Sequence, residues 1–312
     1  MNPSLALGLM ILSATLHAIW NVALRRHHDA PAAVLLFLLG ASGMMMLAAL
    51  VDTFFFERGA EALRVAFYWS LAAGVTEGIR FAALARAIRI GPLATVYTVS
   101  RGVPLIALWP ASVLLFHERA DLLTAVAVLT LLGGLLVLSP RAGASGTGAE
   151  TTTGAETTTG AETTTRAGYF WAVIAALATV LYSLAYKAAL ARGAPVLPLF
   201  GAALIIAAPI SAAGLSPWET SLDALAHRMS AAFLARPWLV VLGAFAFAGS
   251  FLTALYTMRQ EGAAWVLTMR NMSIAFAPLL AWAALGERPS RRAFAGVVLV
   301  FAGALVLGLR AG

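Results

Sequence analysis

The chain has 312 residues, of which 61% are hydrophobic and 11% are charged. A soluble protein of this length does not bury so many apolar side chains, so the composition indicates a membrane protein. The chain contains no cysteine, which excludes disulfides and cysteine-ligated metals. We attribute the formal charge of +7 to arginines that flank membrane helices and face phospholipid headgroups, rather than to nucleic-acid binding.

The hydropathy pattern predicts an all-α, polytopic fold of about ten membrane helices, since a spanning helix needs about 20 mostly apolar residues. Strands of a β-barrel would instead alternate with period two. Arg25 and Arg26 follow the first apolar segment and no basic residue precedes it, so we expect a retained helix rather than a signal peptide. The expected spans are roughly 3–24, 31–51, 66–88, 91–116, 120–138, 168–190, 196–214, 236–258, 263–285 and 291–310.

Two segments break this pattern. Residues 148–165 are three copies of Gly-Ala-Glu-Thr-Thr-Thr, which lack apolar anchors and predict a flexible linker. Residues 220–235 carry apolar side chains at helical spacing, which predicts an amphipathic helix in the membrane interface, with a solvated loop as the alternative. The expected organisation is a first five-helix repeat over 1–139, a linker over 140–167 and a second five-helix repeat over 168–312.

The two halves are related by a shift of 169 positions, which aligns several rare residues. The aligned pairs are Arg101 with Arg270, Glu118 with Glu287, and Gly134 with Gly303. An odd number of helices in each half places the halves upside-down to each other. Inverted repeats of this kind are typical of transporters, in which the substrate binds near the middle of the membrane between the repeats.

Three short motifs carry a resemblance to a known family. They are His17-Ala18-Ile19-Trp20-Asn21 in the first span, a Gly-Pro that opens the fourth span, and a Glu-Arg after the fourth and ninth spans. Through them the chain resembles the ten-helix, EamA-type proteins of the drug/metabolite transporter superfamily. The resemblance implies movement of small metabolites, often export, without ATP hydrolysis. The sixth span departs from the pattern, with Tyr186 and Lys187 in place of the Trp-Asn pair.

The resemblance also implies that both termini lie in the cytoplasm. The loop arginines favour the reverse, because nine lie in odd-numbered loops and six in even-numbered loops and the tail. We expect a multi-pass protein of a bacterial inner membrane with both termini in the cytoplasm.

Charged residues inside the spans are the strongest functional signal. A mid-helix arginine costs about 2.5–3.5 kcal/mol on insertion scales, so such residues are expected to face a cavity or a partner. Arg101 and Arg270 lie deep in their spans at equivalent positions of the two repeats. We predict that they bind an anionic group of the substrate bidentately. The alternative is an internal salt bridge or carbonyl contact that joins helices.

Further candidates for the substrate site lie near these arginines or on polar stripes of other spans. They are Asn271, Tyr97, Trp265, His17, Trp20, Asn21 and Tyr186. Ordinary helix packing and hydrogen bonding are the alternative for each of them. Pro104 and Pro278 are candidate hinges, because proline interrupts the hydrogen bonds of a helix.

Glu77 and Arg80 lie three residues apart on the third span and therefore share a helix face. The simpler interpretation is an ion pair within the helix. The alternative is that Glu77 is a proton-coupling group for transport, influenced by Arg80 and by burial.

These signals predict a secondary transporter of a small anionic or zwitterionic metabolite, such as an amino or organic acid, that works by alternating access and is an exporter. A lipophilic drug or cation exporter is disfavoured, because the spans hold four basic residues and one acid. A lipid-handling membrane protein, a membrane enzyme acting on lipid phosphates and a non-transporting subunit remain alternatives.

The sequence has no P-loop, HExxH or GxSxG motif, so we predict neither an enzyme nor a nucleotide-driven motor. No catalytic residue, metal or cofactor is expected. The predicted partners are the small-molecule substrate and the lipid bilayer, with no nucleic acid, and a homodimer is left open.

Overall fold

The computed structural model describes residues 2–56, 59–91, 93–118, 121–138, 158–215, 221–276, 279 and 290–308. The helices are α1 (Pro3–Arg25), α2 (Ala30–Phe56), α3 (Ala60–Ile90), α4 (Leu93–Phe116), α5 (Leu122–Leu138), α6 (Thr158–Ala191), α7 (Val196–Leu215), α8 (Leu222–Ala235), α9 (Pro237–Met258), α10 (Ala263–Arg270) and α12 (Arg291–Gly308). After a turn at Asn271, residues 272–276 are helical again. The predicted all-helical fold class is confirmed, and each expected span coincides with a helix over the residues described, except that the ninth span is interrupted by a turn at Asn271.

Seven helices in the described part of the chain are long and apolar enough to cross a membrane, and α5 is a shorter apolar helix. The helix α3 is long but carries several charged residues, among them Glu77 and Arg80. Large apolar side chains stand exposed on the outside of the bundle, with Phe54 and Leu122 more than four-fifths exposed. A surface of this kind needs lipid rather than water as its solvent.

The helix α6 begins at Thr158, within the segment that the sequence predicts to be a flexible linker. Once a strongly apolar helix has formed, each further residue at its end adds one hydrogen bond without a new nucleation step. The last copy of the hexapeptide therefore extends α6, whereas residues 140–157 of the predicted linker lie outside the described residues.

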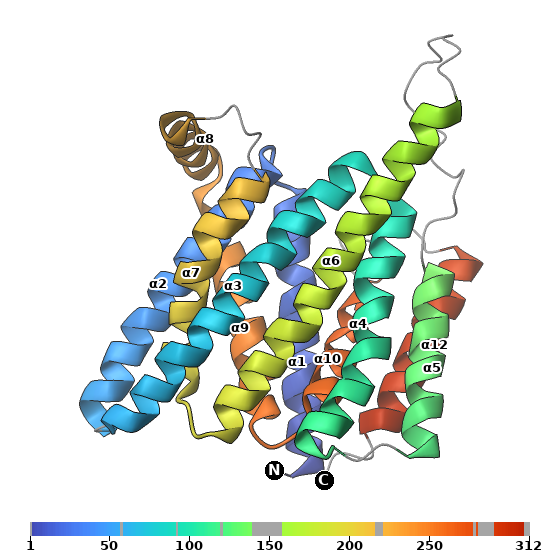
Figure 1. The fold of residues 1–312 in the computed structure, drawn as a ribbon, viewed down its shortest axis with the longest axis horizontal. Helices are drawn as coiled ribbons and strands as arrows, with labels where there is room; N and C mark the ends of the chain where they lie inside the picture. The colour runs from blue at the N-terminus through green and yellow to red at the C-terminus, as the bar shows by residue number, and fades with distance from the viewer. Residues whose placement is uncertain are drawn as a thin grey trace.

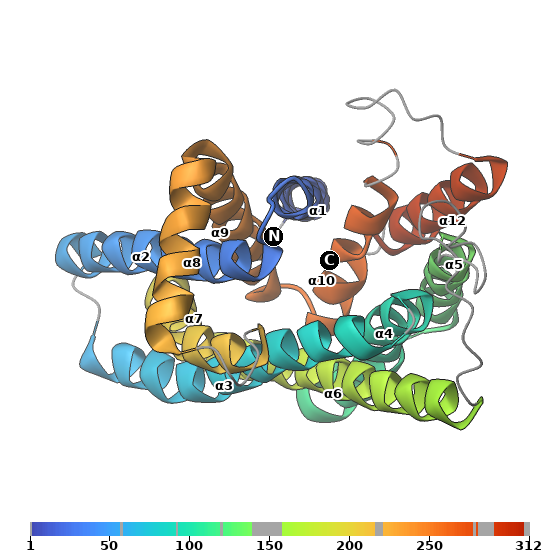
Figure 2. The ribbon, with the colours of Figure 1, turned by 90° about the horizontal axis from the view of Figure 1, so that it is seen from above.

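The bundle is built from helices of the two halves that run in opposite directions. In Figure 1, α1 begins and α12 ends at the same end of the bundle, and α1 runs away from that end while its counterpart α6 runs towards it. Seen from above, α1 and α10 face α3, α4 and α6 across the middle of the molecule, as shown in Figure 2. The helices α5 and α12 pair at one edge, far from α2.

The contacts between helices are symmetric under exchange of the halves. The helix α1 packs on α9 as α6 packs on α3, and α2 packs on α9 as α7 packs on α3. In the same way α4 packs on α6 and α10 on α1, while α2 with α7 and α5 with α12 pair directly across the two halves. The main contacts thus join one half to the other, which is the packing expected of interlocked inverted repeats.

The crossing of α5 and α12 shows this symmetry at the level of single residues. A Cβ atom added to Gly134 would lie 2.8 Å from the backbone nitrogen of Val300. A Cβ added to Gly303 would lie 2.8 Å from the backbone nitrogen of Leu131. The shift of 169 positions relates Gly134 to Gly303 and Leu131 to Val300, so the two contacts are equivalent. Small residues allow the two backbones to approach closely in the membrane.

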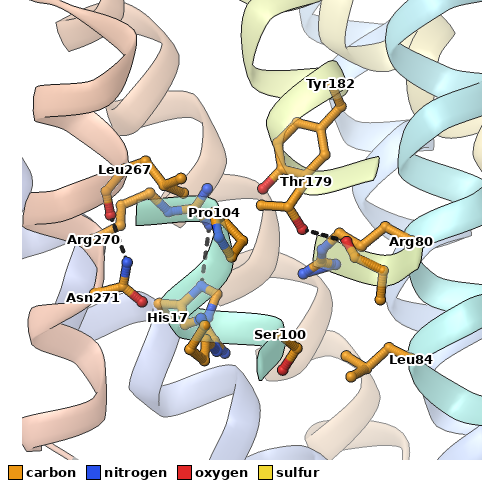
Figure 3. A pocket seen from close by; sticks show the side chains of 12 residues that line it. His17, Arg80, Leu84, Ser100, Pro104, Thr179, Tyr182, Leu267, Arg270 and Asn271 are labelled. Atoms are coloured by element: carbon orange, nitrogen blue, oxygen red, sulfur yellow. Dashed lines mark hydrogen bonds between the residues drawn. The ribbon is translucent and has the colours of Figure 1, made fainter. Parts of the chain in front are cut away.

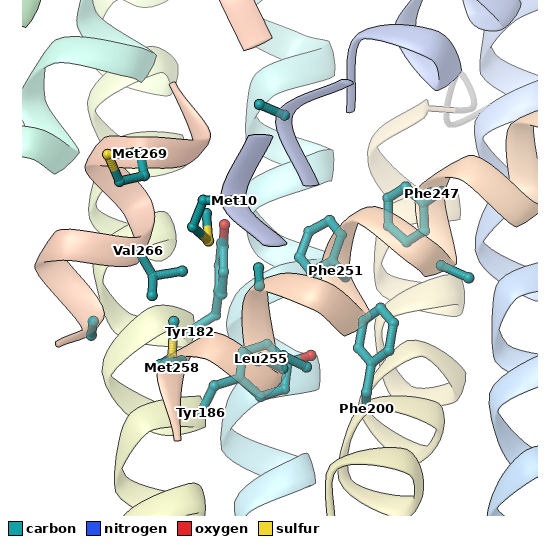
Figure 4. Close-up of a cluster of buried hydrophobic side chains, with 14 of the residues drawn as sticks. Met10, Tyr182, Tyr186, Phe200, Phe247, Phe251, Leu255, Met258, Val266 and Met269 are labelled. Atoms are coloured by element: carbon teal, nitrogen blue, oxygen red, sulfur yellow. The ribbon is translucent and has the colours of Figure 1, made fainter. Parts of the chain in front are cut away.

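Aromatic side chains of α6, α7 and α9, all in the second half, form a buried cluster inside the bundle. Phe200 stacks on Phe251 with ring centroids 5.3 Å apart, and Phe251 lies 4.8 Å from Phe247. Tyr182 and Tyr186 of α6 join this cluster (Figure 4). Since each ring buries a large apolar area, the cluster gives the adjoining charged residues a rigid wall.

The helix α8 lies across the end of the bundle opposite the start of α1 (Figure 1). Its N-terminus is capped by Ser221, whose hydroxyl accepts a hydrogen bond of 3.2 Å from the N–H of Ala224. The prediction that residues 220–235 contain a helix is confirmed.

Arg228 of α8 donates two hydrogen bonds of 2.9 Å to the carboxylate of Asp29, in the turn between α1 and α2. Burial raises the pKa of Asp29, but the hydrogen bonds from Arg228 and from the N–H of Ala32 outweigh it and lower the pKa below its ordinary value. The bridge therefore ties α8 to the first half of the chain at neutral pH.

Candidate substrate site

A central cavity lies between the two halves and is shown in Figure 3. Water-sized molecules can occupy about 50 Å³ of it, enough for roughly four waters. The described residues that line it come from α1, α3, α4, α6, α10 and the turn after α10. They are His17, Arg80, Leu84, Ser100, Arg101, Pro104, Ala175, Thr179, Tyr182, Leu267, Arg270 and Asn271.

The backbone is irregular where α4 and α10 meet the cavity. Pro104 lies inside α4 and has no N–H, so one hydrogen bond of the regular helix is not made at this position. The helix α10 ends at Arg270, and the N–H of Asn271 donates to the carbonyls of Leu267 and Thr268 before the helix resumes. The helix α10 is therefore discontinuous beside the cavity, and discontinuous helices are a recurring feature of transporter binding sites.

Arg270 is a buried charge in the cavity, with 8% of its surface exposed. Its Nη2 atom lies 3.1 Å from Nδ1 of His17 and 3.5 Å from Oγ of Ser250. Its guanidinium carbon stands 4.0 Å from the ring centroid of Phe251, a cation–π contact. Its Nε atom has no hydrogen-bond partner among the described residues.

His17 is held in one tautomer by its neighbours. The indole N–H of Trp20 donates to Nδ1 over 3.2 Å, and Arg270 approaches the same atom. Indole and guanidinium nitrogens are donors, so Nδ1 must be the acceptor and a neutral ring carries its proton on Nε2. Nε2 is buried and has no partner in the described part of the chain. His17 thus presents a further donor at the cavity.

Arg80 also belongs to this cavity. It is 8% exposed, and its guanidinium carbon stands 4.2 Å from the ring centroid of Phe81 and 5.8 Å from that of Tyr182. Its Nη1 atom is buried without a hydrogen-bond partner among the described residues. Arg101, which is half-buried, lines the same cavity, so the two halves bring three guanidinium groups together.

Glu77 does not pair with Arg80, so the favoured ion-pair interpretation is wrong for the structure. The described ion pairs do not join these two residues. The hydroxyl of Tyr186 instead donates to Oε2 of Glu77 over 2.8 Å, and Oε1 of this fully buried carboxyl has no described partner. The reason is that Arg80 turns to the cavity and its aromatic rings, while Glu77 turns to α6.

The other predicted site residues divide into those at the cavity and those behind it. Asn271 lines the cavity and donates from Nδ2 to the carbonyl of Leu267. Trp20 and Asn21 lie behind His17, and Asn21 donates to the carbonyl of His17 over 2.6 Å. Trp20 therefore positions the ring of His17, Asn21 bonds to the backbone of α1, and neither residue is part of the described cavity lining.

Three more candidates lie elsewhere. Trp265 is buried away from the cavity and donates to the carbonyl of Leu307 of α12 over 3.0 Å. Tyr186 borders a second, smaller space beside Arg270 and binds Glu77. The side chain of Tyr97, like the predicted hinge at Pro278, lies outside the described residues.

Polar contacts close the bundle at the end where α1 begins. Lys187 donates to the carbonyls of Met258 and Glu261 over 2.9 and 2.7 Å, so it caps the end of α9 rather than extending to lipid headgroups. Oε1 of Glu118 accepts from the N–H of Ala263 over 2.7 Å and so caps the N-terminus of α10. Glu118, the glutamate of the Glu-Arg motif in the first half, thus has a structural role.

The sequence did not single out Ser100 or Tyr182 as cavity residues, and it placed Arg80 in an ion pair. Ser100 directly precedes Arg101, and Thr179 and Tyr182 belong to a polar stretch of α6. Their polarity within apolar spans was the available signal. Their direction depends on packing between halves, which periodicity within one helix does not specify.

An inverted helical bundle with an apolar exterior and a charged central cavity is the architecture of a membrane transporter. Residues 166–309 match the model of the EamA-like transporter family, which belongs to the drug/metabolite transporter superfamily. A solved crystal structure with 20% sequence identity superposes with a TM-score of 0.68, covering 98% of this chain and 97% of that one. That similarity shows a shared fold. No curated protein matches the sequence.

Proposed function

We propose that the protein exports a small anionic or zwitterionic metabolite, such as an amino or organic acid, by alternating access around the central cavity. One observation carries this proposal: the described lining residues include Arg80, Arg101 and Arg270 but no aspartate or glutamate. Buried guanidinium groups bind carboxylate or phosphate strongly, because the hydrogen bonds are charge-assisted and bidentate.

Alternating access follows from how the cavity is built. Arg80 and Arg101 belong to the first half, whereas Arg270 belongs to the second, so a ligand held by all three is held by both halves. Rocking of one half against the other opens the cavity to one side at a time. At the end where α1 begins, Glu118 of the first half accepts a hydrogen bond from Ala263 of the second half, and we expect this contact to break when that side opens.

A lipophilic cation would be repelled by this site. Such a ligand needs a carboxylate, and the nearest buried one, Glu77, is engaged by Tyr186 outside the cavity lining. The thermal-unfolding test below also includes lipophilic cations and lipids, so it distinguishes the anion carrier from a cation exporter and from a lipid-handling protein.

The test is thermal unfolding of the detergent-purified protein in the presence of amino acids, organic acids, lipophilic cations and lipids. A ligand at 100 times its Kd stabilises a protein by about 2.7 kcal/mol, which is a readily measured rise in Tm. We expect an acid to raise the Tm of the wild type and of Arg64→Ala, an exposed control on the same helix as Arg80, but not of Arg101→Ala. A response to lipophilic cations or lipids alone would refute the anion carrier.

We also propose that the protein lies in a bacterial inner membrane with both termini in the cytoplasm. The support is the match to the transporter family together with the position of α1 and α12, which begin and end at the same end of the bundle. Because the chain has no cysteine, a single introduced cysteine reports its side of the membrane. An impermeant maleimide should label His28→Cys in cells with a permeable outer membrane but leave Gln260→Cys unlabelled. The reverse pattern would place the termini outside.

A further inference from the structure

Hydrogen-bond donors without partners surround the central cavity. Among the residues that line it, Nη1 of Arg80, Nε of Arg270 and Nε2 of His17 are buried without a described partner. All three side chains are more than nine-tenths buried. The two buried carboxylate oxygens that lack partners belong to Glu77 and Glu118, which do not line the cavity. The site therefore needs acceptors from its ligand and offers few charged acceptors of its own.

The positive charge around the cavity exceeds the negative charge, because Glu77 acts on both Arg80 and Arg270 from outside the lining while Arg101 adds a third guanidinium group. Neither Arg80 nor Arg270 takes part in a described ion pair, and aromatic rings cover one face of each guanidinium. A buried charge without a partner is strongly unfavourable. A ligand with one negative charge neutralises one of these arginines and leaves the other buried, whereas a ligand with two negative charges neutralises both.

We infer that the ligand is a small dianion, a dicarboxylate or a phosphate monoester, with one anionic group at Arg270 and His17 and the other at Arg80. This inference rests on the proposed function and narrows its substrate class. A zwitterion fits less well, because its ammonium group needs a carboxylate and none lines the described cavity. Arg80 lies on α3 of the first half and Arg270 on α10 of the second, so the dianion bridges the halves.

The size of the cavity limits the dianion to a short one. The space holds roughly four waters in this state, so a ligand with a few carbon atoms fits with modest widening, whereas a bulky one requires the halves to separate. A short dianion also allows both anionic groups to reach arginines on opposite walls at once.

The experiment is isothermal titration calorimetry of the purified protein with matched probes. Succinate is compared with butyrate, which has the same chain length and one charge less, and glycerol 3-phosphate is compared with glycerol. Alanine serves as the zwitterion. We expect at least one dianion to bind about tenfold or more tightly than its matched probe, as expected for added charge-assisted hydrogen bonds. Binding of succinate would identify the ligand as a dicarboxylate, and binding of glycerol 3-phosphate would identify it as a phosphate ester.

The variant Arg80→Gln should reduce this preference to within about twofold, because it weakens the binding of the dianion and leaves the binding of butyrate unchanged. Arg80→Lys keeps the charge and should retain most of the preference, which separates loss of charge from misfolding. Arg64→Gln, on the same helix, should bind as the wild type does. A preference that survives Arg80→Gln, or no binding of either dianion, would overturn the inference.

Tighter binding of alanine than of either dianion would overturn the inference of a dianionic ligand. It would not contradict the proposed function as a carrier of amino or organic acids. The proposed function fails separately, if no acid raises the Tm in the panel described above.

Discussion

Buried polar groups without partners concentrate the chemistry of this protein in a few side chains. Arg270 and Arg80 present free donors at the cavity, and His17 presents Nε2 because Trp20 and Arg270 occupy Nδ1. Leaving such groups unsatisfied costs on the order of 1–3 kcal/mol each, and more for charges. A ligand that satisfies them in one state of the transporter gains that free energy on binding.

The convergence of Arg101 and Arg270 was predictable, since the internal repeat relates them and repeats of this kind meet at the middle of the membrane. The direction of Arg80 was not. Spacing of three residues places Glu77 and Arg80 on one helix face, but Tyr186 from another helix attracts the carboxyl and Phe81 and Tyr182 cover the guanidinium. Contacts between helices override a rule based on one helix.

Glu77 is the residue through which transport is expected to depend on pH. The groups that act on it are Tyr186 from α6, Arg80 on its own helix and Arg270 from α10. Glu77→Gln keeps the shape and removes the titrating proton. We expect transport by the wild type to vary with pH, and transport by Glu77→Gln to lose that variation while substrate affinity changes less than about threefold, since Glu77 does not line the cavity.

The measurement is the initial rate of substrate uptake into proteoliposomes between pH 5 and 8, with calorimetry for affinity. An unchanged pH profile in Glu77→Gln would exclude Glu77 from coupling.

At the scale of helices, the sequence predicted position and number well, because long apolar segments have few alternatives in a membrane. It missed the end of α10 at Arg270, since no glycine or proline marks the turn at Asn271. It also placed the start of α6 too late, since polar threonines were read as linker although they extend an existing helix. Both misses depend on context beyond the local composition.

The crossing of α5 and α12 gives a matched pair of variants. A Cβ on Gly134 would meet the backbone of Val300 at 2.8 Å, whereas a Cβ on Gly133 would meet nothing within 4 Å. Gly134→Ala should destabilise the protein by about 1–3 kcal/mol through overpacking. Gly133→Ala should leave stability unchanged or raise it by about 0.5–1 kcal/mol through helix propensity. Thermal unfolding in detergent measures both, and equal effects would contradict the close crossing.

The attachment of α8 predicts a dependence of stability on pH. The pKa of Asp29 is lowered in the folded protein, so the bridge to Arg228 contributes stability above the ordinary pKa of aspartate. That contribution is lost as the pH falls through the lowered pKa. Because the side chains of Arg228 and Asp29 are 34% and 18% exposed, we expect about 0.2–1 kcal/mol.

Asp29→Asn should therefore lower the Tm at pH 7, and this effect should shrink as the pH falls to about 3, because the unfolded chain then binds a proton at Asp29 before the folded protein does. Thermal unfolding of both proteins across this range measures the difference. A difference in Tm that is the same at both pH values would show that the bridge does not contribute.

At the scale of the whole molecule, function follows from the way the halves interlock. Nearly every main helix contact joins one half to the other, and the cavity lies where their charged residues meet. The sequence repeat predicted the inverted halves, whereas the partners of each helix emerged from the packing. Any movement of one half changes the shape of the cavity, which couples binding to access.

The most direct test is transport by the purified protein in liposomes that contain no other protein. The account predicts that the wild type moves at least one labelled dicarboxylate, phosphate ester or amino acid across the membrane. It also predicts that Arg101→Ala and Arg270→Ala lose that movement by about tenfold or more, since each removes a charged contact to the substrate, while Arg64→Ala retains it. Movement of lipophilic cations or lipids alone, or acid transport that survives both cavity substitutions, would contradict the account.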